Sequence, residues 1–294
     1  MKTKIAASAF LLLLVTACGA DADPEAASEV DTPSADVSDA TSDEGEPEPS
    51  PTEDEAGPAV AKRALREAVK TMEHDEVTGF ESHIRIVGET YGVTTGVAVA
   101  SGWESSSVFN GEGETTYVMN VRSTDGAVWM QMDKWAGDAH GCWLSMDAGG
   151  VPVGILAMRP DVPGYFSLLG LLRTSGFADE TQSVMVGDLL ANGALGLLTA
   201  QVAAELDLTG VRPSDRVPVE IGYDGSRVSS VAMSGSDFLQ MVESAGGSAS
   251  ATARAALEAT EITVAYSKPE KPVTVSAPPA NLVMTADELK SGCH

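Results

Sequence analysis

The chain has 294 residues, of which 43% are hydrophobic, and its 43 acidic and 18 basic side chains give a formal net charge of −25 at pH 7. This excess of negative charge argues against nucleic acid and against anionic lipid headgroups as electrostatic partners. We therefore expect no nucleic-acid partner, whereas charge leaves binding through apolar contacts open.

The first 17 residues have the features of a signal peptide. Lys2 and Lys4 form a short positive region, an apolar run follows from residue 5 to 16, and Ala17 is the small residue that a signal peptidase requires. Because the run from residue 5 to 17 has about 13 residues, it is shorter than the roughly 20 residues of a membrane-spanning helix. We expect this segment to be removed.

The stretch Val15-Thr16-Ala17-Cys18 resembles the lipobox of bacterial lipoproteins, although Leu is commoner at the position of Val15. The resemblance implies that the Cys18 thiol carries a diacylglyceryl group, with acyl chains such as palmitate, and becomes the mature N-terminus. It places the protein at the extracytoplasmic face of the cell membrane, held by a lipid anchor. The alternative is an ordinary secretory peptide that contains a cysteine.

Residues 18–58 form an acidic segment. Between residues 21 and 58 there are fourteen Asp and Glu residues and no Lys or Arg. Such a composition cannot bury enough apolar surface to offset chain entropy, which predicts a disordered tether. The alternative is an acidic interaction segment.

Residues 59–294 are expected to form one domain. Apolar residues recur at helical spacing over 60–72, and after Gly79 the period changes to 2. Strand-like runs separated by Gly, Asn or Asp predict an antiparallel meander: 80–88, 93–104, 104–110, 115–123, 127–132 and 141–147.

The second half of this domain combines helices and strands. An apolar run over 165–172 predicts a helix that lies across the sheet. Asp224-Gly225 is the strongest hairpin signal in the chain. Strands are predicted at 197–210, 217–224, 226–235 and 260–267. A polar helix is predicted at 237–246, with continuation through 251–259, and an extended Pro-rich segment at the end. The fold class is α+β.

The lipobox cysteine, the first helix leading into a meander, the FSLLGLL helix, the VPVEIGYDGSRVSSVAMSG hairpin and the closing PVTVSAPPANLVMTADEL together resemble the LolA-like superfamily, specifically actinobacterial lipoproteins of the LppX/LprG type. The resemblance implies a strongly curved antiparallel sheet, a half-barrel that wraps around helices. It also implies an apolar cavity that holds the acyl chains of lipids or lipoglycans. The WAGDAHGCW segment and the cysteines at 142 and 293 match no motif of this family.

Catalytic motifs are not found in the sequence: there is no HExxH, GxSxG, SxxK or phosphate-binding loop. Asp133, Asp138 and Asp147 near His140 could form an acid/base or metal cluster, but a hairpin loop rich in Gly and Asp explains them more simply. We expect neither an enzyme nor a cofactor or metal site.

With Cys18 acylated, Cys142 and Cys293 remain in an exported chain, where disulfides persist. A bridge between them is expected, and two separate thiols are the alternative.

Apolar residues on two strand-like runs and on the 165–172 helix are candidates for lining a ligand cavity, with plain core packing as the alternative: Trp129, Met130, Trp143, Leu144, Tyr165, Phe166, Leu168, Leu169 and Leu172. The expected function is that of a cell-envelope lipoprotein that binds or shuttles an acylated lipid or lipoglycan. The alternative is a surface-displayed interaction or sensor lipoprotein with a filled core.

Overall fold

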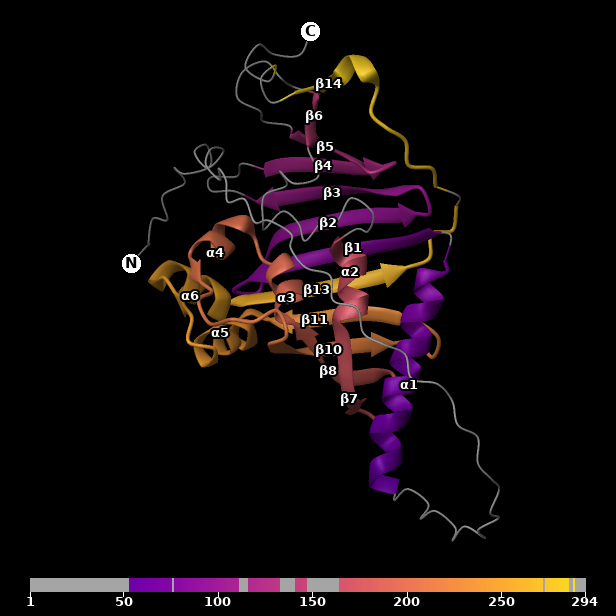
Figure 1. The fold of residues 1–294 in the computed structure, drawn as a ribbon, viewed down its shortest axis with the longest axis vertical. Coiled ribbons are helices and arrows are strands. Elements are labelled where there is room, and N and C mark those ends of the chain that lie inside the picture. Colours follow the sequence, from indigo (N-terminus) through magenta and orange to yellow (C-terminus); the bar gives the residue numbers. More distant parts are fainter. Residues whose placement is uncertain are drawn as a thin grey trace, which may run out of the picture. The chain divides into compact units, whose positions relative to one another are not determined.

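The computed structural model of the chain describes residues 53–75, 77–110, 116–132, 141–146, 164–271, 273–285 and 288. These residues form an α+β structure in which helices pack on a single large sheet (Figure 1). The predicted fold class is confirmed at this level, and the sheet is mostly antiparallel.

The large sheet has twelve strands. Its spatial order is β14 (Val283–Met284), β6 (Trp143–Met146), β5 (Ala127–Met132), β4 (Thr116–Thr124), β3 (Gly102–Asn110), β2 (Glu89–Val99), β1 (Val77–Ile86), β13 (Thr260–Ser267), β11 (Val228–Ser234), β10 (Arg216–Tyr223), β8 (Val184–Leu190) and β7 (Leu172–Phe177). Only the pairing of β14 with β6 is parallel among these strands. A second, two-stranded sheet contains β9 (Leu206–Asp207) and β12 (Ser248–Ala249).

Strands β1 to β6 follow one another both along the chain and across the sheet. This confirms the predicted antiparallel meander. The run 93–104, expected as one strand, is instead divided by a turn at Ala100-Ser101 between β2 and β3. The strands are long because the alternation of apolar and polar residues continues on both sides of each turn.

The strands of the other half were predicted less completely. The hairpin of β10 and β11 and the strand β13 are confirmed, whereas β7 and β8 were missed. The strand predicted at 197–210 is wrong, since this segment contains the helix α4 (Ala200–Ala204) and only the two residues of β9. Thr199 accepts a hydrogen bond from the Val202 N–H and so caps α4, and Ala is the best helix former.

The helices are α1 (Glu53–Glu73), α2 (Gly164–Leu171), α3 (Ala191–Gly196), α4, α5 (Gly235–Ser244) and α6 (Ala251–Glu258), with a short 3-10 helix, η2 (Ala280–Leu282). Helix α1 starts at Glu53, inside the segment 18–58 that the composition predicts to be disordered. Glu and Ala favour helices, so an acidic composition does not prevent a helix there. The predicted continuation of α5 into the next helix is interrupted by β12.

The helices pack on one face of the sheet. Helix α1 contacts β7 and β11, α3 contacts β8 and β10, and α5 contacts β10, β11 and β13 (Figure 1). The strands beneath alternate between buried and exposed residues, as in Val217, Val219 and Ile221 of β10. We call the face that carries these buried residues the covered face, and the opposite one the open face. On the open face Glu81 and Glu261 are exposed.

Two separate apolar clusters lie on the covered face. The main cluster joins the helices to β1, β7, β8, β10, β11 and β13. The second cluster belongs to the strands β3 to β6 and is defined by Trp103, Met119, Val121, Val128, Met130 and Leu144, with Met132 and Met146 packed against it. The described helices that contact the sheet do so at strands of the main cluster.

Candidate functional site

The second cluster is held together by cross-strand pairs. Val121 of β4 pairs with Met130 of β5, and Met130 pairs with Leu144 of β6. Residues that pair directly project from the same face of a sheet, so these three side chains form one continuous apolar surface. Each of them is at most 8% exposed. The flexible thioethers of its methionines suit contact with apolar partners of different shape.

A strip of small and hydroxyl-bearing residues separates the two clusters. On β2 and β3, the Thr94 and Ser107 hydroxyls form a buried hydrogen bond of 2.9 Å. Gly96 lies beside them, and a Cβ atom at this position would collide with the ring of Phe80 and lie 2.6 Å from the carbonyl oxygen of Glu104. The glycine therefore lets the Phe80 ring of β1 cross β2, which marks the end of the main cluster.

Two polar atoms on the covered face are buried and have no hydrogen-bond partner: Nε1 of Trp103 and Oγ1 of Thr78. The two residues are 1% and 2% exposed. A buried donor without a partner costs about 1–3 kcal/mol relative to a paired one. The two atoms are thus an unusual feature of a surface that is otherwise apolar or internally hydrogen-bonded.

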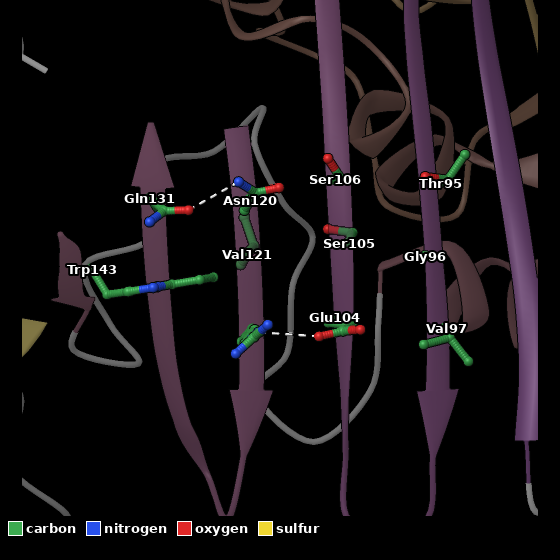
Figure 2. Close-up of a pocket in the computed structure, with 11 residues that line it drawn as sticks. Thr95, Gly96, Val97, Glu104, Ser105, Ser106, Asn120, Val121, Gln131 and Trp143 are labelled. Carbon is green, nitrogen blue, oxygen red and sulfur yellow. Dashed lines mark hydrogen bonds and ion pairs between the residues drawn. The ribbon is translucent and has the colours of Figure 1, made fainter. Parts of the chain in front are cut away.

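A polar pocket of about 340 Å³ lies on the open face, across β2 to β6 (Figure 2). Its side chains alternate with those of the second cluster: Asn120 flanks Val121, and Gln131 flanks Met130. The Asn120 amide nitrogen donates to the Gln131 oxygen over 3.0 Å, and the Gln131 amide donates to the Gly141 carbonyl. These amides therefore satisfy each other and the backbone.

An ion pair and an indole complete this pocket. Arg122 Nε lies 3.1 Å from the Glu104 carboxylate, and the guanidinium carbon lies 4.9 Å from the ring centroid of Trp143. The pocket holds one cation and one anion that pair with each other, so it presents little net charge to a ligand. Most of the residues that line it are polar, and the larger apolar ones are Val97, Val121 and Trp143.

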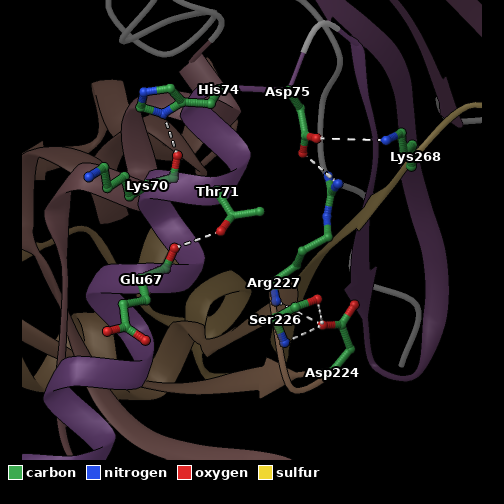
Figure 3. Close-up of polar contacts among 9 residues, drawn as sticks. All are labelled: Glu67, Lys70, Thr71, His74, Asp75, Asp224, Ser226, Arg227 and Lys268. Carbon is green, nitrogen blue, oxygen red and sulfur yellow. Dashed lines mark hydrogen bonds and ion pairs between the residues drawn. The ribbon is translucent and has the colours of Figure 1, made fainter.

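A third polar site joins α1 to the β10–β11 hairpin (Figure 3). Arg227 Nη1 lies 2.5 Å from the Asp75 carboxylate, and both side chains are at most 15% exposed. Lys268 Nζ approaches the other carboxylate oxygen at 3.9 Å. Asp224 accepts hydrogen bonds from the Ser226 and Arg227 N–H groups and fixes the turn. The site is a structural clamp between elements that are distant in the sequence.

The predicted cavity residues are divided by the structure. Met130 and Leu144 belong to the second cluster. Trp129 pairs with Ser145, so it projects from the open face, and Trp143 lines the open-face pocket. The two tryptophans and the two aliphatic residues therefore cannot line one cavity, because alternate residues of a strand point to opposite faces.

The remaining candidates lie around α2. Leu168 and Leu169 are buried in the main cluster, and Leu172 is the first residue of β7 and not part of the helix. Tyr165 and Phe166 are residues of α2, but their side chains are outside the described part of the structure. The leucines are core residues, so α2 in this structure is packed as part of the core and not as a separate lid.

Several predicted sites are outside the described residues: Cys18, Cys293, the acidic residues 133, 138 and 147, and His140. Among the residues that the structure describes, no group of three or more His, Cys, Asp and Glu residues could hold a metal ion. No helix in the described ranges is long and apolar enough to cross a membrane. Cys142 is described and buried, at 2% exposed.

Sequence reasoning missed Thr78 and Trp103. A tryptophan at the start of a strand is an ordinary core residue by its pattern, and no local signal shows whether an indole N–H finds a partner. Only the strand register places these two residues in one row across β1, β2 and β3.

The fold and the site define a class of protein: an α+β structure with one large sheet that helices cover on one face. A second apolar cluster lies on this face, beside the helix-covered half. No family model matches the sequence, and no curated protein matches it either. Solved structures that are similar to this chain include the following two.

The first is the crystal structure of the lipoprotein LppX of Mycobacterium tuberculosis, with a TM-score of 0.38 and 13% sequence identity over 74% of this chain and 99% of LppX. The second is LprF from Mycobacterium bovis, with a TM-score of 0.37 and 10% identity over 76% of this chain and 99% of LprF. LppX, a lipoprotein of the type expected from the sequence, is therefore among the similar structures, at low sequence identity and a TM-score below 0.5.

Proposed function

We propose that this chain is a cell-envelope lipoprotein that binds or shuttles an acylated lipid or lipoglycan. The acyl chains lie against the second cluster on the covered face, where Met130 and Leu144 supply the wall. The sheet curves as a half-barrel around this space. Binding is driven by burial of methylene groups, each contributing about 0.8 kcal/mol, and no covalent chemistry or cofactor is involved.

One observation carries this proposal: the second cluster is a separate apolar surface, not an extension of the main core. Between the two lies the strip that includes Thr94 and Ser107. A domain usually has one contiguous core with smaller satellite clusters, and the second cluster of this chain extends over the four strands β3 to β6. A second surface rich in methionine is suited to an adaptable apolar ligand.

The location of the protein follows from its first residues. Residues 1–17 are removed as a signal peptide, Cys18 carries the lipid anchor, and residues 18–52 tether the helix α1 and the sheet to the extracytoplasmic face of the cell membrane. The supporting features are the lipobox-like Val15-Thr16-Ala17-Cys18 and the acidic segment behind it. Replacement of Cys18 by Ala is expected to release the protein from the membrane fraction.

The proposal is tested by titrating the purified full chain with a fluorescent fatty acid, dansylaminoundecanoic acid. The variant Met130→Gln places an amide in the apolar wall at nearly constant size. We expect its affinity to fall about tenfold, because an amide without a partner in an apolar site costs at least about 1–3 kcal/mol. The control is Val186→Gln on the open face, where the valine is 52% exposed; it should bind as the unmodified chain does.

Unchanged affinity in a folded Met130→Gln variant would contradict this position for the acyl chain. If the folded chain binds neither this fatty acid nor a neutral acyl ester such as methyl palmitate at any concentration, the lipid-binding function itself is wrong.

A second candidate function is a surface-displayed interaction or sensor lipoprotein with a filled core. One observation favours it: the chain's own atoms bury all six residues of the second cluster, none of which exceeds 9% exposed. In this case the partner is an envelope protein. The expected result is a folded chain that binds no fatty acid and keeps a high unfolding temperature.

A further inference from the structure

Two unpaired polar atoms lie on the covered face at the border of the second cluster. Of the four buried side-chain atoms without a hydrogen-bond partner in the described structure, two belong to the Asp75–Arg227 ion pair, and the others are Thr78 Oγ1 and Trp103 Nε1. The indole N–H can only donate, and the threonine hydroxyl can donate as well. Buried tryptophan normally finds an acceptor for this proton.

The two atoms belong to one row of residues across the sheet. Thr78 of β1 pairs with Ala98 of β2, and Ala98 pairs with Trp103 of β3. The three side chains therefore project from the same face. The backbones of Thr78 and Trp103 are two strand spacings apart, roughly 10 Å, and only the small side chain of Ala98 lies between them. Two buried donors thus lie on one surface, in the same row of the sheet.

The surroundings decide which kind of acceptor suits these donors. The row continues through Ser123 and Val128, and neither it nor the adjacent row of Phe80, Gly96, Ser105, Val121 and Met130 contains a charged residue. An ionised carboxylate or phosphate buried against these two rows would have no cation within them to pair with, which is costly in an apolar site. A neutral group with acceptor oxygens is favoured, and a carboxylic ester presents two of them.

We propose that the row Thr78–Ala98–Trp103 binds the ester group of an acylated ligand. Trp103 Nε1–H and the Thr78 hydroxyl donate to the ester oxygens, and the acyl chain extends from there over Val121, Met130 and Leu144. This inference rests on the proposed lipid-binding function and specifies its ligand class: an acyl ester, and not a hydrocarbon or a free fatty acid anion.

The test uses competition against the fluorescent fatty acid on the full chain with three probes of equal chain length: methyl palmitate, palmitate and hexadecane. The variants Trp103→Phe and Thr78→Val each remove one donor. Valine keeps the shape of threonine, and phenylalanine is smaller than tryptophan, so each variant needs a control with the same replacement. Each should weaken methyl palmitate roughly fivefold, the effect of one hydrogen bond, and leave hexadecane unchanged. The controls are Trp129→Phe and Thr263→Val, which remove the same groups from residues that project to the open face.

A second readout is independent of the variants' folding. The indole N–H resonance of Trp103, identified as the signal missing from Trp103→Phe, should move when methyl palmitate is added to the unmodified chain and stay when hexadecane is added. If Trp103→Phe does not fold, the affinity of Thr78→Val for methyl palmitate tests the ester site. The resonance of Trp103 is then assigned by replacing the other tryptophans with phenylalanine one at a time.

Each remaining outcome contradicts a different claim. If methyl palmitate binds but the variants and the resonance do not respond, the ester site is wrong and the lipid-binding function stands. If palmitate competes more strongly than its ester, the neutral ligand class is wrong. If neither the fluorescent fatty acid nor any of the three probes binds to the folded chain, both the ester site and the proposed function are wrong.

Discussion

At the scale of single residues, Asp179 fixes the turn between β7 and β8. Its carboxylate accepts hydrogen bonds from the hydroxyl groups of Thr181 and Ser183 and from the N–H groups of Ser183 and Val184. These bonds, with that of Thr181 the strongest, lower the pKa of Asp179 from its ordinary value of 3.8 to about 2. The turn is therefore held by the ionised form of this side chain.

A lowered pKa predicts how stability depends on pH at this turn. Because ionised Asp179 is favoured in the folded state, its contribution is present above pH 3.8 and is lost as the pH falls through about 2. The variant Asp179→Asn should unfold at a lower temperature than the unmodified chain at pH 6, and the difference should shrink between pH 4 and pH 2.

Differential scanning calorimetry at several pH values measures this effect. The control is Glu180→Gln, which neutralises the exposed carboxylate next to it and should show no such convergence. A difference for Asp179→Asn that stays constant from pH 6 to pH 2 would show that the carboxylate charge does not hold the turn.

Residues also show where the sequence stops being informative. The alternation of Trp129, Met130, Gln131 and Met132 predicts that neighbours face opposite ways, and the structure confirms the alternation. It could not show which set is covered, because that depends on helices and strands far away in the chain. Gly96 is a similar case, since its role depends on the ring of Phe80 in another strand.

At the scale of elements, the Asp75–Arg227 ion pair holds the end of α1 to the β10–β11 hairpin. Removal of one partner leaves the other charge buried, so Asp75→Ala and Arg227→Ala should each lower the free energy of unfolding by about 3 kcal/mol. The double variant should lose clearly less than the sum of the two single variants.

Urea denaturation of the three variants measures this coupling. The control is the exposed pair of Arg63 and Glu67 on the same helix, whose side chains are 80% and 65% exposed. Their replacement by Ala should change the free energy of unfolding by at most about 0.5 kcal/mol. Additive losses at Asp75 and Arg227 would contradict a direct interaction.

Elements with a strong local pattern were predictable, and those without one were not. Helix α1, the meander and the Asp224-Gly225 hairpin have clear periodicity or turn chemistry, and the structure confirms them. Strands β7 and β8 were missed because Leu172 continues the apolar run of α2, so the sequence shows no boundary there. Strand β14 has only two residues and is a strand only because β6 lies beside it.

At the scale of the whole molecule, the parallel pairing of β14 with β6 brings the C-terminal segment to Cys142. Val283 pairs with Trp143, the residue after Cys142. Cys293 is outside the described residues, and the short chain between it and Met284 is long enough to return to this cysteine. This supports the proposed Cys142–Cys293 disulfide.

Such a disulfide would close a loop of about 150 residues and stabilise the folded state by about 3–5 kcal/mol. With Cys18 acylated, the denatured chain should expose no reactive thiol before reduction and two after it. Alkylation followed by mass spectrometry counts them, and the Cys142→Ser variant should show one thiol and unfold at a lower temperature. Two thiols alkylated without reductant would contradict the bridge.

The central claim is that the second cluster binds an acylated lipid, and native mass spectrometry tests it most directly. The full chain, isolated under mild conditions from the cells that produce it, should have a mass that exceeds the covalently acylated chain by one lipid. Extraction with organic solvent should remove this lipid and leave the covalent anchor. A single mass equal to that of the covalent chain, with no change after incubation with an acyl ester, would contradict the account.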